Sequence, residues 1–218
     1  HDGKVTVMRL NEDGTIGEMT DEVFHKGIGS VAERNFRPHV NCVNITPDQK
    51  YLCAVDLGVD QVKIYKFNDE TGKITLVDML RCELESAPRI IKFSPDGRFA
   101  YLICELKNYI SVYTYKDGPR GPVFELVQTI STLNEYHSKG SAACVLRFSR
   151  DWNYVLCSNA GDNSVGIFKI DRETGMLEKI CILPVSGDYP KAADFFPDNC
   201  HIMALNHESN TMTIFRIN

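Results

Sequence analysis

One segment of about 27 residues recurs four times in this chain, and this repeat restricts the possible folds more than any other feature. The copies align without gaps at residues 41–67, 89–115, 144–170 and 191–217. One column of the alignment consists of aspartates: Asp48, Asp96, Asp151 and Asp198. A fixed period of about 50 residues is typical of repeat architectures such as solenoids and propellers.

Each copy has the pattern strand, tight turn, strand, turn, strand. The apolar runs are short, rich in β-branched and aromatic residues, and bounded by Gly, Pro, Asn and Asp. A fourth strand follows in two copies, at 68–80 and 171–183. Four antiparallel strands per repeat are typical of a β-propeller blade. We therefore predict an all-β fold, a β-propeller of four-stranded antiparallel blades, forming a single domain over residues 1–218.

The number of strands predicts an incomplete ring. Residues 3–19 match the third and fourth strands of a blade, and the last copy ends on a third strand. The chain therefore holds about four and a quarter blades. An open propeller leaves sheet edges exposed, so we expect the missing blades to come from the rest of a longer polypeptide or from another chain. A four-bladed ring closed by strands shared between the two ends is the alternative.

Composition excludes several classes of function. The net charge of −5 and the pI of about 5.7 argue against a nucleic-acid partner. No apolar run has the ~20 residues of a membrane helix, and the first ten residues lack the pattern of a signal peptide. We expect no membrane association and a cytoplasmic location.

The eight cysteines follow the pattern of buried thiols. Cys53, Cys104 and Cys157 lie inside apolar runs, and the chain has no CxxC motif or Cys/His cluster with metal-ligand spacing. Cysteines in such runs act as small hydrophobic residues in a reducing compartment. We expect neither a metal nor a cofactor.

Two columns of the repeat place charged residues at one position in the propeller. The first strand of a blade is innermost, and it begins beside the end of the antiparallel second strand. The column at the start of the first strand is Asn41, Arg89, Cys144 and Lys191. The column at the end of the second strand is Leu57, Glu105, Ala160 and His207. We predict that both columns face one mouth of the central channel and that Arg89 contacts Glu105 there.

Such a pair can perform chemistry. An Arg fork can hold a carboxylate or phosphate at two points, and a nearby Glu can act as general base on water. His207 or His39 could transfer the proton. A salt bridge with a purely structural role is the other interpretation.

Three further features receive structural interpretations. Trp152 falls in a turn column occupied by Gln or Gly in two other copies, and we interpret it as a loop anchor. Residues 115–125 contain Gly, Pro and charged residues and are interpreted as a longer loop. His25 and His137 lie in polar connections and are expected to be solvated.

The blades resemble those of a known family. The segments "RPHVNCVNITPDQKYLCAVDLGVDQVKIY", "APRIIKFSPDGRFAYLICELKNYISVY" and "GSAACVLRFSRDWNYVLCSNAGDNSVGIF" resemble successive blades of the lactonase family of seven-bladed propellers. That family includes propeller-type 6-phosphogluconolactonases and fungal carboxymuconate lactonizing enzymes. The resemblance implies a complete protein of seven blades and roughly 330 to 350 residues.

The family's site residues match this sequence in part. Its Arg corresponds to Arg89 in "APRII" and its Glu to Glu105 in "ICELKN". Its His falls on Asn41, but His39 lies two residues earlier and, by strand alternation, on the same side. The family's second Arg falls on Ala160, and Lys191 retains a cation where relatives often have Arg.

The resemblance implies a metal-independent, cofactor-free lactonase that hydrolyses a sugar-acid lactone such as 6-phosphogluconolactone in carbohydrate metabolism. Glu105, Arg89 and His39 would be catalytic, and Asn41, Lys191 and His207 would bind a small anionic lactone or sugar acid. Because Asn41 and Ala160 replace charged residues, a catalytically impaired propeller that binds a ligand or a protein is one alternative. Muconate-type lactonizing (cycloisomerase) chemistry is another.

Overall fold

The structure is a computed structural model that describes residues 3–30, 35–134, 140–198 and 200–217. Its described residues form seventeen strands and one 3₁₀ turn, Leu57–Val59. Within these ranges no helix has the length and apolar character needed to cross a bilayer. The prediction of an all-β chain is confirmed.

Three blades have four antiparallel strands each, as predicted. Blade 1 consists of β3 (Val40–Ile45), β4 (Tyr51–Asp56), β5 (Gln61–Asn68) and β6 (Lys73–Arg81). Blade 2 consists of β7 (Pro88–Phe93), β8 (Phe99–Cys104), β9 (Tyr109–Gly118) and β10 (Gly121–Ser131). Blade 3 consists of β11 (Ala143–Phe148), β12 (Tyr154–Asn159), β13 (Ser164–Ile170) and β14 (Leu177–Pro184).

Two smaller sheets lie at the ends of the series. Blade 4 has three strands, β15 (Pro190–Phe195), β16 (His201–Asn206) and β17 (Thr211–Arg216), and the leading hairpin has two, β1 (Lys4–Leu10) and β2 (Ile16–Phe24). The hairpin forms a sheet of its own and does not pair with β17. The alternative of a four-bladed ring closed by shared strands is therefore wrong.

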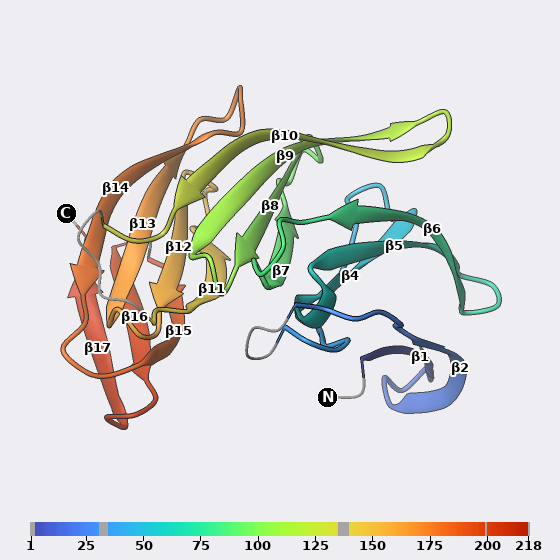
Figure 1. Cartoon of the computed structure of the whole chain (residues 1–218), viewed down its shortest axis with the longest axis horizontal. Coiled ribbons are helices and arrows are strands. Elements are labelled where there is room, and N and C mark those ends of the chain that lie inside the picture. The colour runs from blue at the N-terminus through green and yellow to red at the C-terminus, as the bar shows by residue number, and fades with distance from the viewer. Residues whose placement is uncertain (1–2, 31–34, 135–139, 199, 218) are drawn as a thin grey trace.

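The blades follow one another in an open arc with their first strands on the inside (Figure 1). Strands β3, β7, β11 and β15 contact one another in series, whereas β6, β10 and β14 lie on the outside of the arc. The beginnings of the first strands therefore lie at one end of the inner side of the arc, and we call this end the channel mouth.

Apolar clusters between successive blades form the core. Ile91 and Phe93 of β7 are buried against strands of blade 1. Their repeat equivalents in β3, Val43 and Ile45, are 51% and 50% exposed. This difference arises because β3 has no complete blade on its other side, in keeping with a partial propeller.

The segment 115–125 is a strand hairpin, so its interpretation as a loop is wrong. β9 continues to Gly118 and pairs with β10 from Gly121 onward, with Pro122 opposite Asp117. Pro122 lies on the outer edge strand of the sheet, where a missing N–H removes no bond to a further strand. Gly, Pro and charged residues are typical of loops, so the sequence pattern did not indicate a strand here.

The turn between the second and third strands links each blade to the next. Asp60, Asn108 and Asn163 share one repeat position with left-handed backbone, at φ between 52° and 53°. The carboxylate of Asp60 accepts hydrogen bonds from the backbone N–H groups of Glu85 and Ala87, each at 2.8 Å. Ala87 lies two residues before Arg89, so this contact helps to fix the start of β7.

The predicted burial of three cysteines is confirmed. Cys53, Cys104 and Cys157 have exposed fractions of 0%, 1% and 0%. Burial raises the pKa of each of these thiols to about 12. These thiols therefore stay protonated and pack as apolar groups.

Candidate functional site at the channel mouth

Arg89 and Glu105 contact each other, as the repeat predicted. Arg89 is the second residue of β7, and Glu105 directly follows the last residue of β8. Arg89 Nη1 donates a hydrogen bond to Glu105 Oε2. The side chains are 26% and 1% exposed, respectively. A nearly buried carboxylate is thus paired with a guanidinium that still reaches solvent.

The backbone of Glu105 is held between blades 2 and 3. Its N–H donates to Ala87 O at 2.8 Å, and its carbonyl accepts from Ala143 N at 3.1 Å. The first bond joins the second strand to the first within blade 2, and the second reaches the start of β11. The position of the carboxylate is therefore set by two backbone contacts.

A β-bulge interrupts the first strand of every blade at the column that contains Arg89. The pairing register shifts between Val40 and Cys42, between Pro88 and Ile90, between Ala143 and Leu146, and between Pro190 and Ala192. Bulges leave a residue unpaired and change the direction of its side chain, and they are frequent beside functional sites. The repeat alignment located this column but did not reveal the bulge.

The bulged residues connect the blades around the mouth. Arg89 Nε donates to the carbonyl of Cys144 at 2.8 Å, and Asn41 Nδ2 donates to the carbonyl of Arg89 at 3.1 Å. Each side chain thus contacts the backbone of the equivalent residue in the next blade. Asn41 is exposed and forms the same kind of link between blades 1 and 2 that Arg89 forms between blades 2 and 3.

The guanidinium retains binding capacity. Its hydrogen bonds within the described residues use Nε and Nη1, which leaves both N–H groups of Nη2 for a ligand. Three contacts, with Asn41 of blade 1, Glu105 of blade 2 and Cys144 of blade 3, hold the guanidinium and its strand in place. Such a preorganised cation can bind an anionic group or the negative oxygen that develops during attack on a carbonyl.

Lys191 and His207 occupy the equivalent positions of blade 4, and both are exposed. The ammonium of Lys191 lies 5.3 Å from the ring centre of Tyr189, and His207 N donates to Tyr189 O at 2.9 Å. No side-chain contact among the described residues joins either of them to Arg89 or Glu105. Their predicted role in substrate binding remains a prediction.

His39 precedes β3 and is half-buried. Its backbone N–H donates to Asp56 Oδ1 at 2.7 Å, and its carbonyl accepts from Leu57 N at 3.0 Å. Because the bulge breaks strand alternation at Asn41, alternation does not establish that His39 faces the same side. Leu57 and Ala160, the counterparts of Glu105 in blades 1 and 3, are buried and apolar.

The prediction of a solvated His25 is wrong. Its side chain is fully buried, and Nδ1 lies 2.6 Å from Asp56 Oδ2, which is equally buried. Nε2 has no hydrogen-bond partner among the described residues. The polar sequence around His25 does not indicate its contact with Asp56, which lies 31 positions later in the chain. His137 lies outside the described residues.

The carboxylate, imidazole and thiol groups of the described residues include no set of three or more arranged to hold a metal ion. The site at the mouth therefore offers charge and hydrogen bonds from side chains. Its distinguishing group is the Arg89 guanidinium backed by Glu105.

Comparison with known proteins extends this picture. The family model described as "Lactonase, 7-bladed beta-propeller" matches residues 1–218. An uncharacterized protein of Lactococcus lactis subsp. cremoris is 34% identical over 215 residues, which is 99% of this chain and 61% of that protein. The 6-phosphogluconolactonase of Bacillus subtilis is 29% identical over 215 residues, or 99% of this chain and 60% of that enzyme.

The solved structures agree with the sequence comparison. The periplasmic gluconolactonase of Pseudomonas aeruginosa superimposes with a TM-score of 0.90 at 27% identity, over 99% of this chain and 60% of that one. The chain thus spans about three fifths of the length of the relatives it matches.

Proposed function

The chain belongs to the lactonase family of seven-bladed β-propellers, and on this basis we propose that the complete protein hydrolyses a sugar-acid lactone such as 6-phosphogluconolactone. The observation that carries the proposal is the Arg89–Glu105 pair at the channel mouth. The names of the B. subtilis and P. aeruginosa relatives support the substrate class. The reaction belongs to carbohydrate metabolism.

Arg89 supplies the positive charge that the reaction needs. Water adds to the lactone carbonyl carbon, and the carbonyl oxygen becomes an oxyanion that Nη2 of Arg89 can stabilise. The ring C–O bond then breaks, and the leaving ring oxygen becomes a hydroxyl group by receiving the first proton lost by the water. The other product is a carboxylic acid, which releases the second proton to solvent and becomes a carboxylate. Removal of one such donor typically lowers kcat about 10²- to 10³-fold.

Glu105 and His39 divide the remaining roles. Because the Glu105 side chain is only 1% exposed and paired with Arg89, its burial supports a positioning role that holds the guanidinium in place. His39, half-buried and two residues before Asn41, is the candidate general base on water. Asn41, Lys191 and His207 are candidates for contacts to the substrate.

The test measures 6-phosphogluconolactone hydrolysis by the full-length protein relative to the spontaneous rate. We expect Arg89→Met to lower kcat/KM at least 100-fold, and Arg81→Met, on the exposed outer strand β6, to leave it unchanged. Glu105→Gln separates the two roles of Glu105. Because Gln can still accept the Arg89 hydrogen bond, a positioning role predicts a partial loss and an unchanged pH profile.

A general base at Glu105 predicts instead a nearly complete loss together with disappearance of the acidic limb of the pH profile. A wild-type rate equal to the spontaneous rate contradicts the proposed activity on this substrate.

Non-catalytic binding of a small anionic ligand is the second candidate. The observation in its favour is the replacement of expected charged residues by Asn41, which bonds to backbone, and by Ala160, which is fully buried. A ligand such as 6-phosphogluconate that binds at the mouth, without any acceleration of lactone hydrolysis, would support this function.

For the compartment, we propose the cytoplasm because the eight cysteines are free and disulfides are rare in reducing compartments. One relative is periplasmic by its name, so fractionation of cells that express the full-length protein is the direct test.

A further inference from the structure

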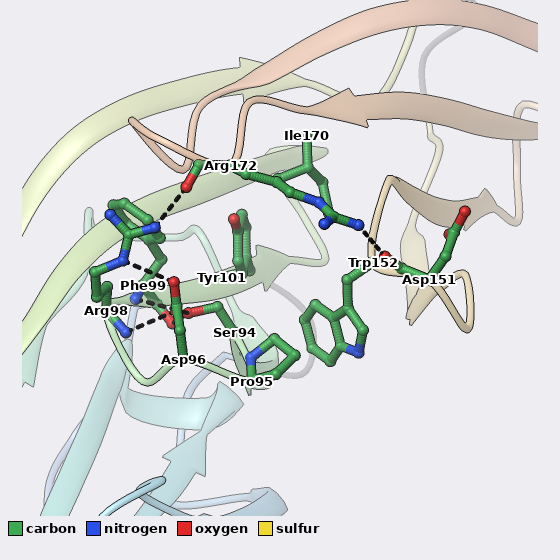
Figure 2. Close-up of a pocket in the computed structure, with 10 residues that line it drawn as sticks. All are labelled: Ser94, Pro95, Asp96, Arg98, Phe99, Tyr101, Asp151, Trp152, Ile170 and Arg172. Atoms are coloured by element: carbon green, nitrogen blue, oxygen red, sulfur yellow. Dashed lines mark hydrogen bonds and ion pairs between the residues drawn. The ribbon is translucent and has the colours of Figure 1, made fainter.

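A pocket lies between blades 2 and 3, at the end of the first strands opposite the channel mouth (Figure 2). It has a volume of about 320 Å³. Its walls are the turn at 94–98 after β7, Asp151 and Trp152 from the matching turn of blade 3, Ile170 and Arg172, and the rings of Phe99 and Tyr101. Both flanking blades have all four strands, so the pocket lies in the complete part of the propeller.

The repeat provides an internal comparison for this pocket. Trp152 has the same repeat position as Gly97, and Pro95 has that of Pro47. Between blades 1 and 2 a side chain at Gly97 would place its Cβ 3.2 Å from Pro47 Cβ, so these turns pack closely. Between blades 2 and 3 a whole indole occupies the corresponding place, and Figure 2 shows it beside the ring of Pro95.

The indole of Trp152 is held as a rigid wall. It stacks on Phe148 with ring centres 4.2 Å apart and an interplanar angle of 23°. Phe148 in turn meets the edge of Tyr101 at 5.2 Å, and the Tyr101 hydroxyl donates to Gly175 O at 3.0 Å. A fixed aromatic ring is therefore available for an apolar face of a ligand.

The charged groups of the pocket balance and are already paired with protein atoms. Arg98 Nε donates to Asp96 Oδ2 at 2.7 Å, and Arg98 Nη2 donates to Arg172 O at 2.6 Å. Arg172 Nη2 donates to the carbonyl of Asp151. Two guanidinium and two carboxylate groups give no net charge, so the pocket has no excess charge to attract an ion.

Hydrogen-bonding capacity nevertheless remains on the walls. Within the described residues Arg172 uses only Nη2, which leaves its Nε and Nη1 as donors. The Asp96 carboxylate has acceptor capacity beyond its bonds with Ser94 and Arg98. Figure 2 shows the Asp151 carboxylate pointing away from Asp96 and the aromatic rings, so Asp151 faces the pocket with its backbone. The pocket thus presents an aromatic face, donors and acceptors within one small volume, which is the usual make-up of a small-molecule site.

We propose that this pocket binds a neutral hexopyranose, with the apolar face of the sugar on Trp152 and its hydroxyl groups hydrogen-bonded to Arg172 and Asp96. Sugar hydroxyls both donate and accept, so they can bond with both Arg172 and Asp96. An anionic ligand would meet the Asp96 carboxylate, and a purely aromatic ligand would leave the polar groups without ligand partners. This site is independent of the function proposed for the channel mouth.

The test titrates the full-length protein with methyl α-D-glucopyranoside and methyl β-D-galactopyranoside, up to about 100 mM, and follows tryptophan emission and ligand-observed NMR. Trp152 is the one tryptophan of this chain, and the difference from Trp152→Phe isolates its signal. We expect at least one of these sugars to bind saturably, with half-saturation on the order of millimolar.

Matched variants locate the binding. Trp152→Gly is expected to abolish it, and Gly is tolerated by the backbone there because φ is 57° and blade 2 has Gly at this position. Arg172→Ala should weaken binding roughly tenfold, whereas the exposed Arg81→Ala should not. Arg89→Met should leave it unchanged, which separates this pocket from the channel mouth.

Three results would overturn the proposal. These are the absence of saturation by either sugar, binding that survives Trp152→Gly, and glucuronate or indole binding more tightly than both neutral sugars.

Discussion

The Arg89–Glu105 pair predicts an asymmetric effect of mutation on stability. Glu105 is 1% exposed and Arg89 is 26% exposed. Arg89→Met therefore removes the guanidinium that is paired with a buried carboxylate, which typically costs about 3 to 5 kcal/mol. Loss of the bond to Cys144 O adds about 1 kcal/mol.

Glu105→Gln should cost much less. Gln retains an oxygen that can accept from Nη1, and the remaining Arg89 charge reaches solvent, so we expect a loss of about 1 to 2 kcal/mol. In the double variant neither charge remains, and the two effects should not add. The expected coupling free energy is at least ~1.5 kcal/mol, because much of the Arg89→Met cost requires a charged Glu105.

The assay is the denaturant midpoint of the full-length wild type, both single variants and the double variant, at constant m-value and ionic strength. Arg81→Met serves as the control for loss of an exposed arginine. Equal losses for the two single variants, or additive losses in the double variant, would refute the account of a buried and dependent carboxylate.

Three further predictions concern the scaffold. Gly175→Ala should lower the free energy of unfolding by about 2 kcal/mol or more, because φ at Gly175 is +73° and the new Cβ would lie 2.4 Å from the Phe99 ring. A denaturant midpoint within error of wild type would contradict this. The pKa of Asp96 is lowered below its usual value: partial burial opposes this shift, but the hydrogen bonds that the carboxylate accepts from Ser94 and Arg98 outweigh it. Asp96 should therefore contribute stability above about pH 4, and this contribution is lost as pH falls through the folded-state pKa. Asp96→Asn should flatten the acidic part of a stability–pH curve. Of the eight cysteines, the exposed Cys200 should react with a disulfide reagent much faster than Cys53, Cys104 and Cys157, because burial raises the pKa of these three thiols to about 12. Equal labelling rates measured by mass spectrometry would contradict the burial of the three thiols.

The repeat predicted the blades and the contact between Arg89 and Glu105 because propeller symmetry converts a shared sequence column into a shared position. It could not predict the bulge at that column, since an extra unpaired residue leaves the repeat spacing unchanged in every blade. The contact of Arg89 with Cys144 O follows from that bulge.

Other features depend on contacts that local sequence does not encode. The polar neighbours of His25 predict a solvated side chain, whereas the structure buries it against the distant Asp56. The β9–β10 hairpin reads as a loop because an edge strand tolerates Pro122. The sequence around Trp152 indicates a loop anchor, and only the inter-blade geometry shows that this residue lines a pocket.

The most direct test of the central claim, that the Arg89–Glu105 pair is the functional centre, is calorimetric titration of the full-length protein with 6-phosphogluconate. The account predicts binding to wild type and to Arg81→Met, and at least tenfold weaker binding to Arg89→Met. Equal affinity for wild type and Arg89→Met, with both proteins folded, would contradict it.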